Sequence, residues 1–323
     1  MRRMSDAANR LLLIDGHGLA FRAFYALPRT TNSRGQATQV LRGYLSMMLR
    51  VISEDGRFDY AAAAFDPPGM TFRDEMLDSY KAQRQKTPVD VTEQVPLCRQ
   101  MTEKLGIPAL MAPGYEADDV LGTLSRQASE LGMETVILSS DKDLLQLVDS
   151  HTTVRTAHRD AAGAATIYDY AKVVRDFGFE PIRMIDYKAL CGDSSDNLPG
   201  VPGIGPKTAR ELISQYGGLD AILGAVGTMP AGRAKAALAG RENEVKISRD
   251  MVTIVRDVPG VMLELSACRV GVYDRRAVEQ LMDDLGIGGL KRNLPQEMTP
   301  PALDNDEIDI SQLDIDDLIG LAG

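Results

Sequence analysis

The sequence predicts an α/β protein in which a mostly parallel central sheet is flanked by helices. Short apolar runs that suit strands alternate with longer runs that suit helices, and this alternation is typical of a parallel sheet covered by helices. Several apolar runs end in an aspartate, which places acidic side chains at one edge of the sheet. With 323 residues, 44% of them hydrophobic and 25% charged, the chain is long enough for a large α/β unit with a smaller unit attached.

Each predicted element has its own local signal. Residues 11–14 and 60–65 are apolar runs that end at Asp15 and Asp66, and residues 135–138 lead through two serines to Asp141. Residues 107–111 form the remaining predicted strand. Helices are predicted over residues 36–53, 117–131 and 208–215.

The composition excludes several classes of protein. No apolar run is long enough to span a membrane, and residues 1–10 precede only four apolar residues, too few for a secretory signal. The three cysteines, Cys98, Cys191 and Cys268, are odd in number, far apart and without CxxC spacing, which predicts neither disulfides nor a zinc site. We therefore expect a cytoplasmic protein with no membrane partner.

The net charge of −10 argues against a nucleic-acid partner, because domains that bind nucleic acid are usually basic. The distribution of the charges changes this interpretation. Eight acids lie beyond Arg292, the last basic residue, and without them 36 basic residues face 38 acidic ones. Residues 16–53 contain no acid, so they suit either an anion-binding surface or an ordinary solvated helix face. Their arginines are Arg22, Arg29, Arg34, Arg42 and Arg50.

Nine carboxylates are the main candidates for a metal site. Asp15, Asp66 and Asp141 follow predicted strands and should meet at the carboxyl edge of the sheet. The segments YEADD, DKD and GDSSDN supply the others. The full set is Asp15, Asp66, Glu116, Asp118, Asp119, Asp141, Asp143, Asp193 and Asp196.

Each of these acids alone suits a helix N-cap or a turn, but nine that converge would repel one another strongly without cations. Hard oxygen ligands favour Mg²⁺ or Mn²⁺, and we expect two ions, or three, about 4 Å apart for in-line displacement at phosphorus. If these nine acids are also set aside, the remaining chain has a balance of +7.

Two further segments suit contacts with DNA. Residues 200–209, GVPGIGPKTA, predict a tight hairpin between helices, with free backbone N–H groups and Lys207 at the start of the second helix, although a plain glycine-proline turn is the alternative. Residues 71–100 predict a mobile helical element over the site. Within it, Lys81 and Arg84 are three residues apart on one helix face and suit a scissile phosphate.

Five segments occur in order: LLLIDGHGLAFRAFYAL, AFDPPGMTFRDEMLDSYKAQR, GYEADDVLGTL, ILSSDKDLLQLV and YKALCGDSSDNLPGVPGIGPKTA. Together they resemble the 5′ nuclease (flap endonuclease) family, most closely the 5′–3′ exonuclease domain of bacterial DNA polymerase I. The resemblance covers residues 10 to 290. Because the length leaves no room for a polymerase domain, we expect a free-standing member of the family.

The resemblance implies a metal-dependent phosphodiesterase that removes 5′ flaps and degrades duplex DNA from 5′ ends, including RNA primer remnants, in replication and repair. It implies all nine carboxylates as metal ligands, and Asp15, Asp66, Lys81 and Arg84 as catalytic. A K⁺ ion bound by main-chain oxygens of the hairpin is also implied. The implied DNA contacts are Arg22, Tyr25, Lys81, Arg84, Lys188, Gly203, Gly205 and Lys207.

The same resemblance implies the domain organisation. A nuclease core would span residues 10–180, with a helical arch at about 70–100, and a helical subdomain with the hairpin would span 181–293. Residues 296–323 are rich in acids and proline and predict a disordered tail that aids solubility. Within the tail, residues 312–315 (QLDI) partly resemble the short peptide by which bacterial replication proteins bind the sliding clamp, but Asp316 follows where that peptide has an aromatic residue. A third hypothesis is that the acidic tail lies on the basic DNA-binding surface and inhibits it.

Two other functions stay open at this point. A PIN-type ribonuclease also places carboxylates at a sheet edge, but it is generally shorter and lacks the helical hairpin. A non-catalytic DNA-binding module would keep the hairpin and lose the acids. For the main hypothesis we expect a monomer that works beside a separate DNA polymerase and ligase.

Overall fold

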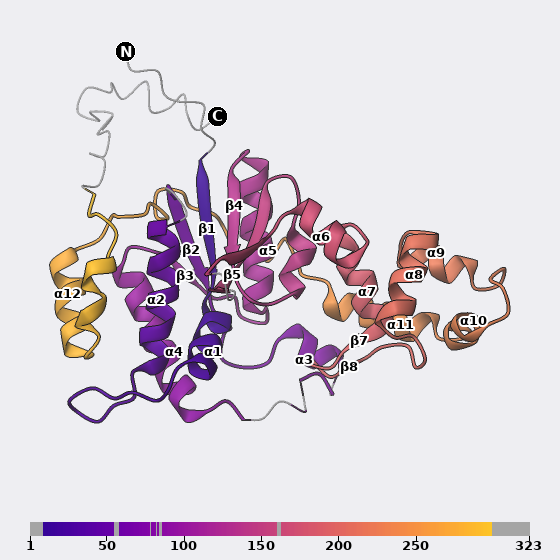
Figure 1. Cartoon of the computed structure of the whole chain (residues 1–323), viewed down its shortest axis with the longest axis horizontal. Helices are drawn as coiled ribbons and strands as arrows, with labels where there is room; N and C mark the ends of the chain where they lie inside the picture. The colour runs from indigo at the N-terminus through magenta and orange to yellow at the C-terminus, as the bar shows by residue number, and fades with distance from the viewer. Residues whose placement is uncertain are drawn as a thin grey trace, which may run out of the picture.

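The computed structural model of the chain describes residues 9–54, 58–77, 79–81, 83, 86–159 and 163–298 (Figure 1). At its centre is a six-stranded sheet in which five strands are parallel and the last, β6, is antiparallel, so the predicted fold class is confirmed. In spatial order the strands are β3 (Ala109–Leu110), β2 (Tyr60–Ala64), β1 (Arg10–Asp15), β4 (Glu134–Leu138), β5 (Thr152–Arg159) and β6 (Ala165–Tyr168).

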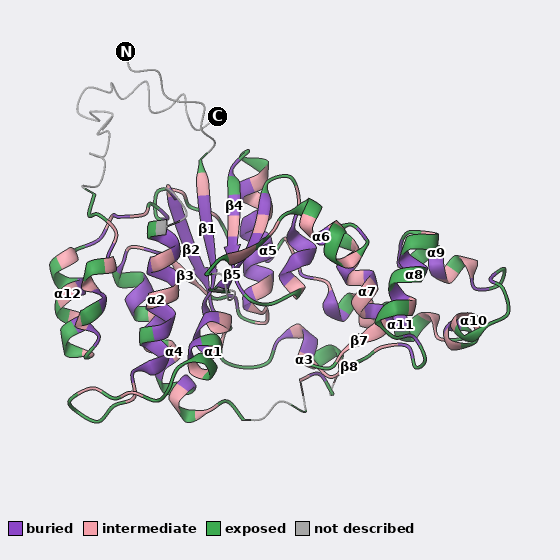
Figure 2. Cartoon of the chain, viewed as in Figure 1, coloured by how far each residue is buried: buried purple, intermediate pink, exposed green. Residues whose placement is uncertain are grey.

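Strand β1 is buried on both faces, as its continuous apolar sequence requires (Figure 2). Leu12 and Ile14 point to one face and Leu11 and Leu13 to the other, because successive side chains of a strand alternate. The first face is covered by α1 (Gly16–Ala26), α2 (Gln39–Glu54), α4 (Val89–Lys104), α12 (Arg275–Asp284) and the 3-10 helix η3 (Gly288–Asn293).

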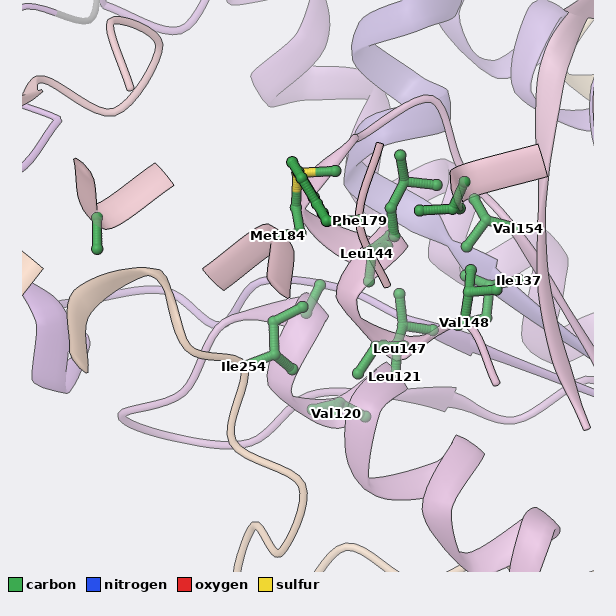
Figure 3. Close-up of a cluster of buried hydrophobic side chains, with 14 of the residues drawn as sticks. Val120, Leu121, Ile137, Leu144, Leu147, Val148, Val154, Phe179, Met184 and Ile254 are labelled. Carbon is green, nitrogen blue, oxygen red and sulfur yellow. The ribbon is translucent and has the colours of Figure 1, made fainter. Parts of the chain in front are cut away.

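The second face carries a hydrophobic cluster that includes Ile137 of β4, Val154 of β5, and Val120 and Leu121 of the helix that follows Glu116 (Figure 3). This cluster continues without interruption into the helical part of the chain. The elements on this side are α5 (Ala117–Glu130), η1 (Asp143–Leu147), α6 (Tyr170–Phe177), η2 (Pro181–Arg183), α7 (Met184–Cys191), α8 (Pro206–Tyr216), α9 (Leu219–Ala225), α10 (Arg233–Leu238) and α11 (Glu242–Val252).

The predicted hairpin joins α7 to α8. A small antiparallel ribbon of β7 (Gly192–Asp193) and β8 (Leu198–Pro199) leads into the turn before α8. Gly203 has a φ of +94°, in the left-handed region that favours glycine, and Gly205 is the N-cap of α8. The turn therefore needs glycine at Gly203, in agreement with the predicted hairpin.

The chain returns to the α/β part after α11, which corrects the predicted boundary at residue 293. The backbone N–H groups of Ile254 and Val258 donate to Gln146 and Thr123, and that of Val270 donates to Asp59. Helix α12 and η3 then pack on the first face of the sheet. The helical subdomain thus ends near Val252.

The segment predicted as one helical arch over residues 70–100 is divided. A short helix, α3 (Phe72–Met76), is followed by turns, and α4 then packs its buried Cys98 and Met101 into the core. Arg84 lies outside the described residues. The predicted arch at about 70–100 therefore does not extend over its second half, because α4 is a core helix.

The predicted tail is described only at its start, where Met298 N donates to Gly271 O at 2.7 Å. Residues 299–323, including the clamp-like peptide, lie outside the described residues. Among the helices of the described ranges, none is long and apolar enough to cross a membrane.

One buried ion pair joins three parts of the fold. Arg73 of α3, 3% exposed, forms a bidentate pair with the fully buried Asp119 of α5, with N–O distances of 2.7 and 2.8 Å. The same guanidinium donates to the carbonyl oxygens of Met251 and Thr253, both at 2.8 Å. Arg73 therefore ties α3 to α5 and to the end of the helical subdomain.

Replacing Arg73 with leucine should lower the free energy of unfolding by about 3–5 kcal/mol, because it leaves a buried carboxylate without its partner. Urea denaturation followed by circular dichroism measures this change. The matched control is Arg99→Ala, which removes an exposed pair with Glu103 and should cost no more than about 0.5 kcal/mol. A loss in Arg73→Leu no larger than that of the control would contradict the assigned role.

Candidate functional site

Asp15 stands where β1 ends and α1 begins. Its Oδ1 accepts a hydrogen bond from Gly18 N at 2.7 Å, which caps the helix, and its Oδ2 accepts one from Ser139 Oγ at 2.6 Å. A Cβ at residue 18 would lie 1.9 Å from Oδ2, so only glycine fits there. The cap thus holds the carboxylate at the carboxyl edge of the sheet.

Four other acids gather around Asp15. Asp66 accepts a hydrogen bond from Ala117 N at 2.8 Å, which places it at the N-terminus of α5 beside Glu116 and Asp118. Asp141 follows β4, and its N–H donates to Ser139 Oγ at 3.0 Å. The residues named here the inner acid group are Asp15, Asp66, Glu116, Asp118 and Asp141.

Burial and neighbouring carboxylates raise the pKa of two members of the inner acid group, Asp15 and Asp118. Burial raises the pKa of Asp15 to about 7, and the charges of Asp141 and Asp66 add to the rise, against hydrogen bonds from Ser139 and Gly18 that lower it. Burial also raises the pKa of Asp118 well above its usual range, and the neighbouring carboxylates raise it further. A bound cation would relieve this repulsion.

The outer acid group consists of Asp143, Asp193 and Asp196, each of which offers an oxygen within 4.8 Å of the others. Asp193 belongs to β7 of the hairpin ribbon, and Asp143 is the first residue of η1. The ribbon therefore brings the helical subdomain against η1. Lys188 of α7 pairs with both Asp143 and Asp193, the latter at 2.6 Å. Its ammonium group lowers the pKa of Asp193 against the opposing effect of burial.

One small cavity of about 40 Å³ connects the two groups. Lys81 and Tyr80 line it on the side of α3, and Tyr80 donates to Glu116 Oε2 at 3.2 Å. Its acidic lining consists of Glu116, Asp118, Asp141, Asp143 and Asp196. A set of carboxylate oxygens around a small polar space suits a hard divalent cation, and the described lining has no cysteine or histidine that would favour zinc.

Asp119 does not fit the predicted ligand set. Its two oxygens accept four hydrogen bonds, two from Arg73, one from Glu116 N at 3.0 Å and one from Val255 N at 2.9 Å. All its acceptor positions are thus occupied inside the protein. The prediction that Asp119 binds metal is therefore wrong for this structure, because its carboxylate is a buried structural partner of Arg73.

Two of the predicted cations, Lys81 and Lys188, face the acids. Lys81 pairs with Glu116 and adopts a φ of +54° in a turn, so it does not lie on a helix face as predicted. Arg84, its predicted neighbour on that face, is outside the described residues. Lys188 lies between the outer acids, with its side chain 13% exposed. Each lysine thus lies within the site, beside its carboxylates.

The remaining predicted DNA contacts lie at the surface. Lys207 is 89% exposed in the first turn of α8 and lies 3.8 Å from Glu211. On α1, Arg22 is exposed, and Tyr25 is 76% exposed with its ring edge-on to Phe24. The structure therefore places Lys207 and Tyr25 on separate parts of the fold, one at the hairpin and one on the opposite side of the site.

Sequence reasoning missed two residues that shape the site. Ser139 donates to Asp15 and accepts from Asp141, and its position at the end of β4 is a signal that could have identified it. Arg73 holds Asp119 and lies 3.5 Å from Glu116. Nothing in the local pattern around Arg73 distinguishes it from a surface arginine.

Comparisons with known proteins agree with this geometry. Residues 10–178 match the family model of the 5′–3′ exonuclease N-terminal resolvase-like domain, and residues 179–276 match that of the C-terminal SAM fold. DNA polymerase I of Chloroflexus aurantiacus is 43% identical over 300 residues, which are 91% of this chain and 31% of that protein. The thermostable DNA polymerase I of Thermus aquaticus is 36% identical over 94% of this chain and 35% of its own length. The chain thus spans about a third of the length of these relatives.

Solved structures share the fold at low identity. The 5′-exonuclease of bacteriophage T5, solved with bound zinc, has a TM-score of 0.65 at 18% identity and covers 86% of this chain and 98% of its own. Flap endonuclease-1 of Methanococcus jannaschii has a TM-score of 0.56 at 16% identity, with 88% and 90% covered. Since the two family models together span most of the residues that form the sheet, the helical hairpin and both acid groups, the chain belongs to the 5′–3′ exonuclease family.

Proposed function

We propose that this chain is a structure-specific 5′ nuclease that hydrolyses DNA phosphodiester bonds with divalent metal ions, as both a 5′–3′ exonuclease and a 5′-flap endonuclease. The observation that carries the proposal is the convergence of two acid groups on one cavity beside a helical hairpin. Family membership supports the same function over the two alternatives, a PIN-type ribonuclease and a non-catalytic DNA-binding protein.

The inner acid group would hold one cation and the outer acid group another. When bound, such cations supply an acidified water for attack at phosphorus and positive charge beside the leaving oxygen. Lys81 places its ammonium group at the cavity, where it would exchange Glu116 for a phosphate oxygen. Asp119 and Arg73 keep the start of α5 in place during this exchange.

The hairpin would bind the phosphates of duplex DNA through its own backbone N–H groups. The N-terminus of α8 presents free N–H groups behind Gly205, and Lys207 adds a positive charge there. Such contacts read phosphate positions rather than base sequence, which suits recognition of a structure. Tyr25, on the other side of the site, offers an exposed ring for an unpaired base.

We extend the proposal to cofactors and partners. The site acids suit Mg²⁺ or Mn²⁺, and the main-chain oxygens of the hairpin suit K⁺. The substrates would be 5′ flaps, nicks and RNA primer remnants in bacterial DNA replication and repair, with a DNA polymerase and a ligase acting on the products. We propose that the protein acts as a monomer at the nucleoid in the cytoplasm.

Replacing Asp141 with alanine should reduce metal-dependent cleavage of a 5′-flap substrate by about 10³-fold, because a metal ligand supports several kcal/mol of transition-state stabilisation. Single-turnover cleavage of end-labelled flap DNA measures the effect. Glu130→Ala, which removes an exposed acid from the far end of α5, is the matched control and should cleave normally. Near-normal cleavage by Asp141→Ala would overturn the proposed mechanism.

Replacing Lys207 with alanine should weaken the binding of duplex DNA and reduce the slope of log K against log salt by about 0.9, the value for one phosphate contact. Fluorescence anisotropy over a salt series measures both quantities. Lys104→Ala, at the exposed end of α4, is the control for loss of one positive charge. An unchanged slope in Lys207→Ala would remove this residue from the DNA contacts.

Without metal, the protein should lose stability as pH rises from about 5 to 8. The folded-state pKa of Asp15 is about 7, above its unfolded value, so the folded state binds the proton more tightly and is favoured at low pH. Thermal unfolding in EDTA should therefore give a lower Tm at pH 8 than at pH 5, and added Mg²⁺ should restore it.

Asp15→Asn is the control for the source of this pH dependence, because its side chain stays neutral while it can still accept hydrogen bonds. Its Tm in EDTA should change less between pH 5 and pH 8. Equal Tm values at both pH values in the unmodified protein would contradict the raised pKa.

A further inference from the structure

A groove of about 420 Å³ lies between α1, α2 and the end of β5, outside the acid site. Its floor is apolar and includes Ala23, Met47 and Ala157. Gly43 allows the two helices to approach closely, since a Cβ there would lie 2.6 Å from that of Ala23. The rim carries three arginines, Arg22, Arg42 and Arg50.

The charge of this rim has no acidic partner among the side chains that the structure describes. Of those side chains, none forms an ion pair with Arg22, Arg42 or Arg50, and the groove lining contains no acid. By comparison, the nearby Arg29 pairs with Asp90 at 2.9 Å. The rim arginines come from the acid-free stretch of residues 16–53, which the sequence alone left divided between an anion-binding surface and a solvated helix face.

The shape of the groove favours unpaired nucleotides over a duplex. An apolar floor with a cationic rim can hold a base against the floor and phosphates at the rim, which is how single strands are bound without sequence preference. A duplex keeps its bases inside and would contact the rim alone. Ser46, between Arg42 and Arg50 on the same side of α2, and His158 add polar groups to the lining.

The position of the groove relates it to the acid site. Arg22 follows Asp15 by seven residues of α1, a distance of about 10 Å along the helix. Figure 1 shows α1 and α2 on the side of the sheet opposite the helical subdomain, which carries the hairpin at α8. A strand that leaves a duplex held by the hairpin and passes the acids would reach the side of the sheet on which this groove lies.

We propose that the groove between α1 and α2 binds unpaired nucleotides of the 5′ arm of the substrate, with Arg42 and Arg50 contacting its phosphates. This inference rests on the proposed function for the identity of the substrate. It adds a binding surface beyond the hairpin and the acid site, and it makes the affinity for a flap depend on the single-stranded arm.

The test uses the full chain in EDTA, so that no cleavage is needed for the measurement. Fluorescence anisotropy compares a duplex with a 5′ arm of about fifteen thymidines, the same duplex with a 3′ arm, and the same duplex without an arm. The variant Arg42→Ala/Arg50→Ala should weaken binding of the 5′-arm duplex about tenfold and reduce its salt slope by about 1.4, the value for two single-strand phosphates. Its affinity for the armless duplex should be retained.

Three results would overturn the proposal: no loss of affinity, an equal loss on the armless duplex, or a loss confined to the 3′ arm. Arg276→Ala, which removes an exposed arginine from α12, is the charge control. The variant Arg42→Lys/Arg50→Lys keeps both charges and should retain most of the affinity, which separates loss of phosphate contacts from misfolding. Because binding is measured without metal, this experiment tests the groove even if the protein does not cleave DNA.

Discussion

Arg73 and Asp119 meet where α3, α5 and the end of α11 come together. A buried ion pair adds little net stability compared with apolar packing, but its planar, two-pronged geometry permits one arrangement of the two side chains. Because the guanidinium also binds the carbonyl oxygens of Met251 and Thr253, that arrangement includes the helical subdomain. The relative position of the two acid groups depends on this contact, since one group belongs largely to the sheet edge and the other to the hairpin ribbon.

The start of α5 shows how the fold supports the chemistry. A helix N-terminus leaves backbone N–H groups without partners, and here Asp119 accepts from Glu116 N and Asp66 from Ala117 N. Two adjacent acids therefore have different roles. The carboxylate of Asp119 accepts hydrogen bonds only from groups of the protein, while Asp118 lines the cavity. Asp66 serves both needs, because it accepts a hydrogen bond from the helix N-terminus and belongs to the inner acid group.

Much of this site was predictable because strand ends are readable in sequence. The runs before Asp15, Asp66 and Asp141 define parallel strands, and parallel strands bring their carboxyl ends to one edge. The role of Asp119 was not predictable, because its partner Arg73 lies 46 residues away and nothing local marks the pair. The same holds for the core position of α4 and the return of the chain after α11, which long-range packing decides.

Lys81 and Lys188 show that the protein supplies its own counter-ions within the acid site. Each ammonium group already forms ion pairs with carboxylates: Lys81 pairs with Glu116, and Lys188 pairs with Asp143 and Asp193. An incoming cation therefore enters a site that is partly compensated, and an incoming phosphate meets positive groups that must first leave an internal partner. Occupation of the site is thus an exchange of ionic partners, in which the net change in buried charge is smaller than the number of acids suggests.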